Sequence, residues 1–335
     1  MKENPTWFLK SHPSGMPQTD NWDLRDMPIP DIEGDQLLVR TQWLSVDPYM
    51  RGRISPAKNY AAGLAPGDMM RGGGVGEVVS SNSPHFAPGD IVTSDHFGWQ
   101  SYTVLPAQSA TRVDDTDAPV QSCLSYLGMP GMTAYFSLLR SGAPKKGETV
   151  LISAASGAVG QIAGQIARIK GLDPVAIAGT DEKIAWCREL GYRTGINHRT
   201  TQDIVADVAE ACPDGVDVFL DNTAGPAHDA AMLNLNVNGR VVVVGTIALA
   251  DRFDEPDIGM RHLRQIMIKR ACIQGFLLDD FEADYTTAKA DLLSWYRQGL
   301  LKTREDVSEG IETVPEAFTR MLRGENFGKQ LVRLD

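Results

Sequence analysis

Cysteine and histidine are scarce in this sequence, which contains 4 and 6 of them among 335 residues. The cysteines, Cys123, Cys187, Cys212 and Cys272, lie far apart and form no CxxC pair. A disulfide framework needs many cysteines at short spacings, so this class of protein is disfavoured. Scattered thiols are typical of a reducing compartment, and we expect a cytoplasmic protein.

Long apolar runs and clusters of basic residues are also absent. The longest apolar stretch, residues 241–250, is about half of what a membrane-spanning helix needs. Residues 1–13 contain no continuous hydrophobic segment, and we therefore expect that they are not a signal peptide. A net charge of −11 without any basic run argues against nucleic acid and anionic membranes, because both attract clustered lysine and arginine. We expect no partner of either kind.

The length and a change of pattern along the chain indicate two domains. Up to about residue 120, proline and glycine turns separate short extended segments such as 36–46 and 72–80, which is typical of a β-rich domain. From residue 148, apolar strands alternate with helical segments. We expect these strands at 149–152, 174–178, 194–196, 216–220, 240–244 and 272–277.

Six strands in this alternation predict an α/β fold with a doubly wound, six-stranded Rossmann sheet. The segment from about residue 302 returns to short mixed elements, and we expect it to pack against the first domain. We therefore assign 1–122 and 302–335 to a β-rich domain that carries the catalysis, and 123–301 to a dinucleotide-binding domain.

A small-residue loop follows the strand 149–152 and opens a helical pattern. Gly157 permits close approach of a pyrophosphate, and Gly160 lets the helix pack tightly on the strand, with Ala158 and Val159 between them. The N–H groups at the start of such a helix bind phosphate oxygens. A tight turn without a ligand is the alternative, but the surrounding strands and helices favour a dinucleotide site.

The end of the second strand of this fold indicates which dinucleotide is bound. Gly179 stands where an NAD enzyme usually carries an acid, and Lys183 offers a cation to a 2′-phosphate. Asp181 could instead bind the ribose. In a third interpretation Thr180 or Asp181 only caps a helix and Lys183 is a solvated surface residue. This spacing favours NADP over NAD modestly.

Several longer strings carry a resemblance over essentially the whole chain. They are LSVDPYMRGR from Leu44, LGMPGMTAYF from Leu127, Ala154 to Gly160, Asp221-Asn222, and Asn326-Phe327-Gly328-Lys329. Together they resemble the zinc-free medium-chain dehydrogenase/reductases of the leukotriene 12-hydroxydehydrogenase/prostaglandin reductase type, above all the bacterial NADPH-dependent curcumin reductases. The resemblance implies a GroES-like fold for the β-rich domain, NADPH or NADP⁺ as cofactor, an enone as the small-molecule substrate, and a homodimer.

The resemblance also implies residues that surround the cofactor. Gly157 to Gly160 would hold the pyrophosphate, and Lys183 would meet the 2′-phosphate beside His198 and Arg199, where the family commonly has Tyr and Lys. The remaining positions that it implies, near the ribose and the nicotinamide, are Met129, Thr133, Thr180, Asn222, Gly245, Thr246, Ile247, Phe276, Leu277, Leu278 and Asn326.

Two positions depart from the family pattern. The Asn-Val-Gly-Gly that follows the fourth strand in relatives reads Asn222-Thr223-Ala224-Gly225 here, which looks like a mild change. Relatives often carry a Tyr near the substrate mouth where this chain has Ala250. The identity of the substrate therefore stays open.

The sequence offers no set of zinc ligands. Asp47 stands where zinc alcohol dehydrogenases of this fold have their first Cys, and Met70-Arg71-Gly72 replaces a Gly-His-Glu. We expect no metal. A substrate carbonyl must then be polarised by hydrogen bonds, which suits an enone better than an alcohol.

Two phenols are the candidates for this hydrogen bond. Tyr60 lies in a loop rich in proline, alanine and glycine, and Tyr49 belongs to the VDPYM string; core packing is the alternative for Tyr49 and simple surface exposure for Tyr60. Arg51 and Arg53 could bind an acidic substrate, although ion-paired surface arginines are the more ordinary interpretation. The function predicted is hydride transfer from NADPH to the β-carbon of an enone. A quinone reductase and an NADPH-binding structural protein are the alternatives.

Overall fold

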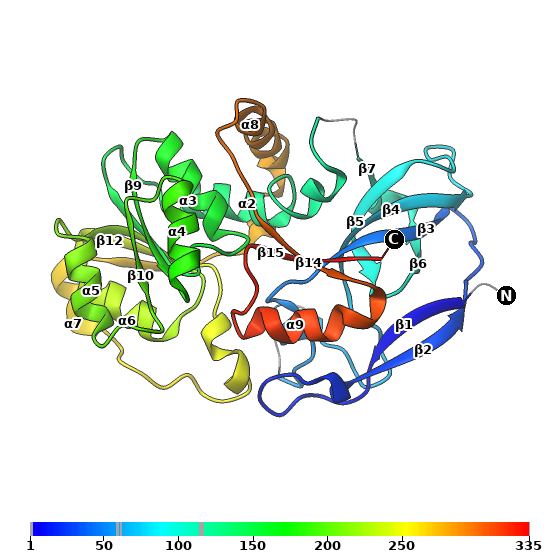
Figure 1. Cartoon of the computed structure of the whole chain (residues 1–335), viewed down its shortest axis with the longest axis horizontal. Helices are drawn as coiled ribbons and strands as arrows, with labels where there is room; N and C mark the ends of the chain where they lie inside the picture. Colours follow the sequence, from blue (N-terminus) through cyan, green and yellow to red (C-terminus); the bar gives the residue numbers. More distant parts are fainter. Residues whose placement is uncertain (1–2, 58–59, 61, 114–116, 335) are drawn as a thin grey trace.

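Two large sheets dominate the structure, a computed structural model that describes residues 3–57, 60, 62–113 and 117–334. In Figure 1 the parallel sheet with its helices forms one half of the molecule and the antiparallel strands form the other, with α9 (Val314–Leu322) between them. Among the described residues, no helix is long and apolar enough to cross a membrane.

The parallel sheet confirms all six strands that the sequence predicts between residues 149 and 277. Its order is β10-β9-β8-β11-β12-β13, the strand order of a complete doubly wound dinucleotide fold. The strands are β8 (Thr149–Ile152), β9 (Asp173–Ala178), β10 (Thr194–Asn197), β11 (Val216–Asp221), β12 (Leu235–Val243) and β13 (Cys272–Gly275).

Alternate side chains of this sheet point into two separate cores. Val150 and Ile152 of β8 pack with one set of helices, and Leu151 between them packs with the other, as the period of two in a strand requires. The first set is α2 (Met129–Phe136), α3 (Gly160–Ile169), α4 (Asp181–Glu189) and α8 (Tyr285–Arg297). The second is α5 (Ile204–Ala211), α6 (Gly225–Leu233) and α7 (Leu263–Lys269). Helices on both faces explain why the strands are continuously apolar.

The other large sheet joins the two ends of the chain. Its order is β14-β15-β3-β4-β5-β7, with β6 paired to β3. The strands are β3 (Gln36–Ser45), β4 (Arg71–Ser81), β5 (Ile91–Gly98), β6 (Tyr102–Pro106), β7 (Thr111–Arg112), β14 (Glu305–Glu309) and β15 (Lys329–Arg333). Because β15 pairs with β3, the segment after residue 302 packs on the first part of the chain, as predicted.

A hairpin and a helical turn complete the β-rich half. β1 (Glu3–Leu9) and β2 (Trp22–Pro28) form a separate two-stranded sheet. The single turn α1 (Met50–Arg53) follows β3 and carries the chain toward the parallel sheet. This turn matters for the site, because it comes directly after the VDPYM string.

Candidate active site

The loop between β8 and α3 is shaped so that only small residues fit. A Cβ on Gly160 would lie 2.4 Å from the Ala154 carbonyl oxygen and 2.6 Å from the Ala155 Cα. A Cβ on Gly157 would meet its nearest atom at 3.1 Å. The helix therefore starts in contact with the strand end. The N–H groups of Gln161 and Ile162 bond back to the carbonyls of Gly157 and Val159, so the N–H groups before them, at residues 158–160, are the ones at the helix start that can meet a ligand. This geometry fits the pyrophosphate of a dinucleotide.

The carboxyl ends of three strands are tied together beside this loop. Asn222 follows β11; its N–H donates to Ser153 Oγ (2.9 Å) and its Nδ2 donates to the Ser153 carbonyl (2.7 Å) after β8. The Gly245 N–H, after β12, donates to the Asp221 carbonyl (3.1 Å). The crevice outside the carboxyl ends of the strands is where this fold binds ligands. Asn222 and Gly245 lie at these strand ends, and their contact with a cofactor stays a prediction.

Three positively charged or basic side chains gather at the end of β9. A Cβ on Gly179 would lie 3.2 Å from His198 Nε2 and 3.3 Å from Arg199 Nε, so both side chains close over this glycine. The pKa of His198 is lowered, first by burial and then by the charges of Arg199 and Lys183. An acidic side chain at residue 179 would lie directly against these groups and occupy the space beside them. With glycine at this position, a 2′-phosphate can bind there and neutralise their charge.

Lys183 is not a solvated surface residue. It is 8% exposed, and burial lowers the pKa of its ammonium group. Its Nζ donates to the Gly324 carbonyl (2.7 Å), and Arg199 Nη2 donates to the Arg323 carbonyl (2.9 Å). Both cations are thus held by the end of α9 in the β-rich half. Thr180 caps α4 through its Oγ1, which accepts the Lys183 N–H (3.2 Å).

Asp181 is occupied elsewhere. It lies in the first turn of α4 and accepts a hydrogen bond from Asn197 Nδ2 (2.8 Å). The cap that the sequence allows at Thr180 or Asp181 is therefore the threonine. A basic cluster of Lys183, His198 and Arg199 fits a 2′-phosphate. This cluster distinguishes the end of β9 from the corresponding strand end of an NAD enzyme.

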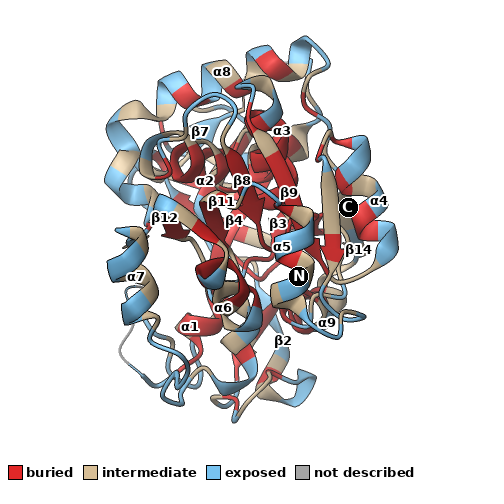
Figure 2. Ribbon diagram, turned by 90° about the vertical axis from the view of Figure 1, so that its left-hand side faces the viewer, coloured by how far each residue is buried: buried red, intermediate tan, exposed pale blue. Residues whose placement is uncertain are grey.

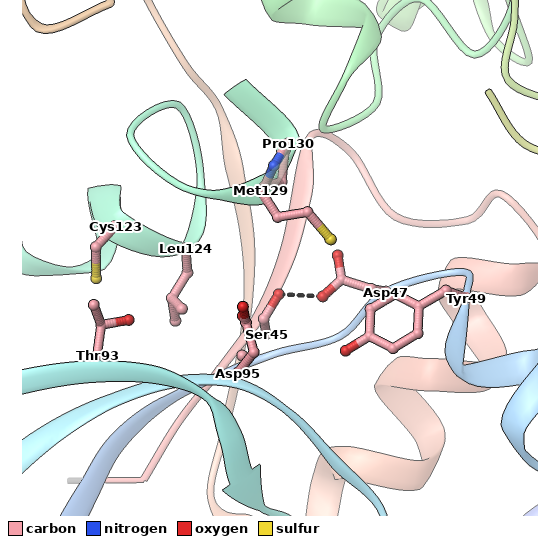
Figure 3. Close-up of a pocket in the computed structure, with 10 residues that line it drawn as sticks. Ser45, Asp47, Tyr49, Thr93, Asp95, Cys123, Leu124, Met129 and Pro130 are labelled. Carbon is pink, nitrogen blue, oxygen red and sulfur yellow. Dashed lines mark hydrogen bonds between the residues drawn. The ribbon is translucent and has the colours of Figure 1, made fainter. Parts of the chain in front are cut away.

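A small cavity joins the two halves of the molecule beside the VDPYM string. Figure 3 shows Tyr49 and Asp47 on one side and Met129, at the start of α2, on the other. The residues that line it are Ser45, Asp47, Tyr49, Gly73, Thr93, Asp95, Cys123, Leu124, Met129 and Pro130. Tyr49 and Met129, predicted as catalytic and nicotinamide-bordering residues, thus share one cavity.

The two candidate phenols differ in exposure. Tyr49 is largely buried; its pKa is raised far above the ordinary value, first by burial and then by the Asp47 carboxylate. Tyr60 is 67% exposed, yet desolvation of its phenol raises its pKa, while Arg53 lowers it and Asp279 raises it. Both phenols therefore keep their protons at neutral pH and can donate hydrogen bonds.

Asp47, the residue at the zinc-ligand position, is held by a lysine. Lys329 Nζ lies 2.9 Å from Asp47 Oδ1 and donates to the Val46 carbonyl (2.9 Å), and both charged side chains are buried. Ser45 Oγ bonds the other carboxylate oxygen. In the part of the chain that the structure describes, no group of three His, Cys, Asp or Glu side chains could hold a metal ion.

The expectation of a surface arginine at residue 51 is wrong. Arg51 is 1% exposed; its Nε donates to the Ala250 carbonyl (2.9 Å) and its Nη2 to the Gly15 carbonyl (3.1 Å). Asp254 lies 3.5 Å from the same Nη2. The guanidinium thus connects α1 to the short helix Ile247–Arg252 after β12, and its burial keeps it away from a substrate that approaches from solvent.

The remaining predicted residues lie around the same crevice, but nothing in the geometry assigns them a ligand. Thr246 lines a second cavity of about 210 Å³ next to Ile247. Phe276 is buried and its N–H donates to the Val243 carbonyl (3.0 Å), whereas Leu277 is exposed. Of the others, Thr133 is buried in α2, Leu278 opens the 3-10 helix Leu278–Asp284, and Asn326 donates to the Gly328 carbonyl (2.8 Å); their contacts with a cofactor stay predictions.

Sequence reasoning missed three pairings at this site. They are Asp47 with Lys329, Arg51 with Ala250, and Asp221 with His228, whose Nδ1 lies 2.8 Å from Asp221 Oδ2. The signal for the first was present, since both residues fall in strings that carry the family resemblance. In the other two pairs, only the folded structure shows that the residues are in contact.

Comparison with known proteins agrees with this geometry. Residues 5–113 match a family described as the N-terminal domain of oxidoreductase, and residues 158–295 match one described as zinc-binding dehydrogenase. YfmJ of Bacillus subtilis is 40% identical over 97% of this chain and 96% of its own length. The NADPH-dependent curcumin reductase of Escherichia coli is 34% identical, with coverage of 99% and 97%.

A solved structure extends the likeness to the whole fold. The crystal structure of CurA from Vibrio vulnificus in complex with NADPH has a TM-score of 0.93 and 36% identity, and the match covers 99% of each chain. The chain belongs to the medium-chain dehydrogenase/reductase family. The fold expected from the resemblance is thereby confirmed.

Proposed function

We propose that this protein reduces the carbon–carbon double bond of α,β-unsaturated ketones or aldehydes and uses NADPH as the reductant. The cluster of Lys183, His198 and Arg199 around Gly179 carries the cofactor assignment. The name of the Escherichia coli relative, an NADPH-dependent curcumin reductase, supports the substrate class, because curcumin contains double bonds conjugated to ketones. When bound, NADPH supplies a hydride to the β-carbon.

The protein's own residues position the substrate and stabilise its oxygen. We assign the carbonyl end of the substrate to the region beside Tyr49 and Met129, where the small cavity of about 30 Å³ lies, and we propose that Tyr60 stands at its entrance. A protonated phenol donates a hydrogen bond to the carbonyl oxygen, on which negative charge develops during the reaction. Asp47 cannot perform this task, because its carboxylate accepts bonds from Lys329 and Ser45. We assign these steps to residues 1–122 and 302–335, and cofactor binding to 123–301.

Steady-state oxidation of NADPH tests the proposal with three acceptors. We expect turnover with a simple enone, little with a quinone, and none without an acceptor. Prior exhaustive chelation should leave the enone rate unchanged, because the zinc-ligand position is filled by the Asp47–Lys329 pair. Turnover with the quinone alone, or chelator-sensitive turnover, contradicts the assignment.

We also propose that the chain forms a homodimer through the free edge of the parallel sheet. β13 is the edge strand, and α7 beside it buries none of its residues. Leu263 and Met267, one helical turn apart, are 67% and 71% exposed, and Figure 2 shows this helix on the outside of the molecule. Further exposed apolar residues in the same stretch are Ile258, Met260, Ile268, Ile273 and Leu277.

A second copy is the partner that this surface fits. Two identical edge strands can pair antiparallel about a two-fold axis and satisfy their free backbone groups. Sedimentation should therefore give a dimer for the wild type and a monomer for Met267→Glu. Leu24→Glu changes an apolar residue on β2 that is 40% exposed and should leave the dimer intact. A monomeric wild type at micromolar concentration disproves the proposal.

We place the protein in the cytoplasm. All four cysteines are free thiols, and Cys187 and Cys212 are buried among apolar residues, as expected in a reducing compartment. Fractionation of the source cells, followed by detection of NADPH-dependent enone reduction, tests this location. Activity confined to an extracellular or membrane fraction contradicts it.

A further inference from the structure

The turn after β11 holds an alanine in a backbone conformation that ordinarily belongs to glycine. Ala224 has φ 60° and ψ −156°. Residues with a Cβ adopt this region only at a cost, and they persist there when the surrounding structure holds them. The family pattern that the sequence resembles implies Gly at this position. The substitution that looks mild in the sequence therefore puts strain into the turn.

A buried carboxylate holds the strained turn in place. Asp221 is 1% exposed, and its Oδ1 accepts the N–H groups of both Thr223 (3.0 Å) and Ala224 (2.8 Å). The Thr223 carbonyl accepts the Ala248 N–H (3.0 Å) from the next loop. Hydrogen bonds to a charged acceptor are stronger than neutral ones, so Asp221 can fix a conformation that Ala224 disfavours.

His228 is the side chain that pairs with the other oxygen of this buried carboxylate. Its Nδ1 lies 2.8 Å from Asp221 Oδ2, and this hydrogen bond is the main reason that the pKa of His228 is raised. Asp229 and Asp257 also face it and act in the same direction. Asp229 itself pairs with His262 (2.7 Å), whose ring centre lies 5.9 Å from that of His228.

The turn sets the position of Asn222 in the cofactor crevice. Asn222 is bonded to Ser153 on one side and is followed directly by the residues that Asp221 holds. We propose that Asp221 and His228 are positioning residues, which keep the strained turn 222–224 closed so that Asn222 can meet the bound dinucleotide. This inference rests on the proposed function, because it concerns the same cofactor.

Two substitutions and their combination test the inference through NADPH dissociation constants and melting temperatures. Ala224→Gly removes the strain while Asp221 still holds the turn; we expect Tm to rise by about 1–3 °C and the Kd to stay within twofold. Asp221→Asn removes the charged acceptor, the alanine can leave the strained region, and the Kd should rise about tenfold or more. In the double variant, glycine can adopt the native turn without strain, so at least threefold of this loss should return.

Asp229→Asn is the matched control, since it removes a carboxylate that pairs with a histidine but does not touch the turn; its Kd should equal that of the wild type. If Asp221→Asn does not fold, His228→Gln with and without Ala224→Gly gives the same comparison. A Tm that Ala224→Gly leaves unchanged or lowers overturns the inference, as does an Asp221→Asn Kd within twofold of wild type. A wild type that does not bind NADPH would refute the proposed function instead, and the Tm comparison would still report on the strained turn.

Discussion

At the scale of single residues, the two candidate phenols differ in exposure. Tyr49 is enclosed, and Arg53 lies over its ring, with the guanidinium carbon 5.3 Å from the ring centre. Tyr60 is mostly exposed. If Tyr60 contacts the substrate as proposed, removal of its hydroxyl should directly slow the reaction.

Replacing Tyr60 by Phe should slow hydride transfer from NADPH to a simple enone by about 10²–10³-fold. The ring remains and only the donor to the developing oxyanion is lost, so the NADPH Kd should not change. Pre-steady-state absorbance at the NADPH band measures the step. Tyr102→Phe, on β6 and outside the cavity lining, serves as the control. A rate within about twofold of wild type would reduce Tyr60 to a surface residue, and a weaker NADPH Kd would make it a cofactor residue.

Lys183→Ala should erase much of the preference for NADPH over NADH. The loss of one charge-assisted contact to a phosphate costs about 1.5–3 kcal/mol, which corresponds to roughly a 10- to 100-fold drop in kcat/KM for NADPH alone. Arg199 remains beside the phosphate site, so Lys183→Ala combined with Arg199→Ala should lose more. Lys170→Ala, at the far end of α3, is the control. Equal use of both cofactors by the wild type would contradict the assignment.

At the scale of elements, the junction of β8 and α3 depends on one glycine more than on the other. A Cβ on Gly160 would collide with backbone atoms at 2.4 and 2.6 Å, whereas a Cβ on Gly157 would be 3.1 Å from its nearest neighbour. We therefore expect Gly160→Ala to lower the free energy of unfolding by about 1–3 kcal/mol. Gly157→Ala should cost less. Urea denaturation of the two variants measures the difference, and equal losses would show that the helix can shift away from the strand.

The contact between β11 and α6 makes stability depend on pH. The pKa of His228 is raised by Asp221, so the folded state binds this proton more tightly than the unfolded chain does. The stabilisation is therefore complete below the unfolded pKa of about 6.5 and is lost as the pH rises through the folded value. Tm measured from pH 6 to pH 8.5 should fall more steeply for the wild type than for His228→Gln. Parallel curves would contradict this linkage.

At the scale of the whole molecule, Arg51 connects the two halves. Its guanidinium bonds carbonyls at Gly15 and Ala250, so Arg51→Ala leaves buried acceptors unpaired and a cavity behind. We expect a loss of about 2–4 kcal/mol in the free energy of unfolding. Arg25→Ala breaks an exposed ion pair with Asp23 and an exposed contact with the Phe8 ring, whose centre lies 4.8 Å from the guanidinium carbon, and should cost less than about 1 kcal/mol. Similar losses for the two variants would show that the halves are held together elsewhere.

The sequence was sufficient to predict the parallel sheet, because each strand can be recognised from its local pattern. For example, 149–152 is an apolar run that is followed by small residues and a helical pattern. The phosphate loop and Lys183 were inferred from the same local order, and their ligands stay predictions. The Asp47–Lys329 pair left only an indirect signal, because both residues fall in strings that carry the family resemblance but are 282 residues apart. The burial of Arg51 could not be predicted, since an arginine after a strand usually lies at the surface. The strained backbone of Ala224 could not be predicted for another reason: a sequence gives the residue type but not the φ that the residue must adopt.

The place of β15 in the antiparallel sheet has a consequence for biosynthesis. β15 lies between β14 and β3, and its first residue, Lys329, neutralises Asp47 in the interior. Once the ribosome has synthesised residues 149–275, every strand of the parallel sheet has been made. That sheet can therefore form before translation ends. The other sheet must wait for its last strands, and until then β3 leaves open the edge at Trp43–Ser45 that pairs with β15, with Asp47 nearby and unpaired. Chaperones that shield nascent chains should therefore act mainly on the first hundred residues, and stop codons placed before residue 329 should yield insoluble protein even though the nucleotide fold is complete.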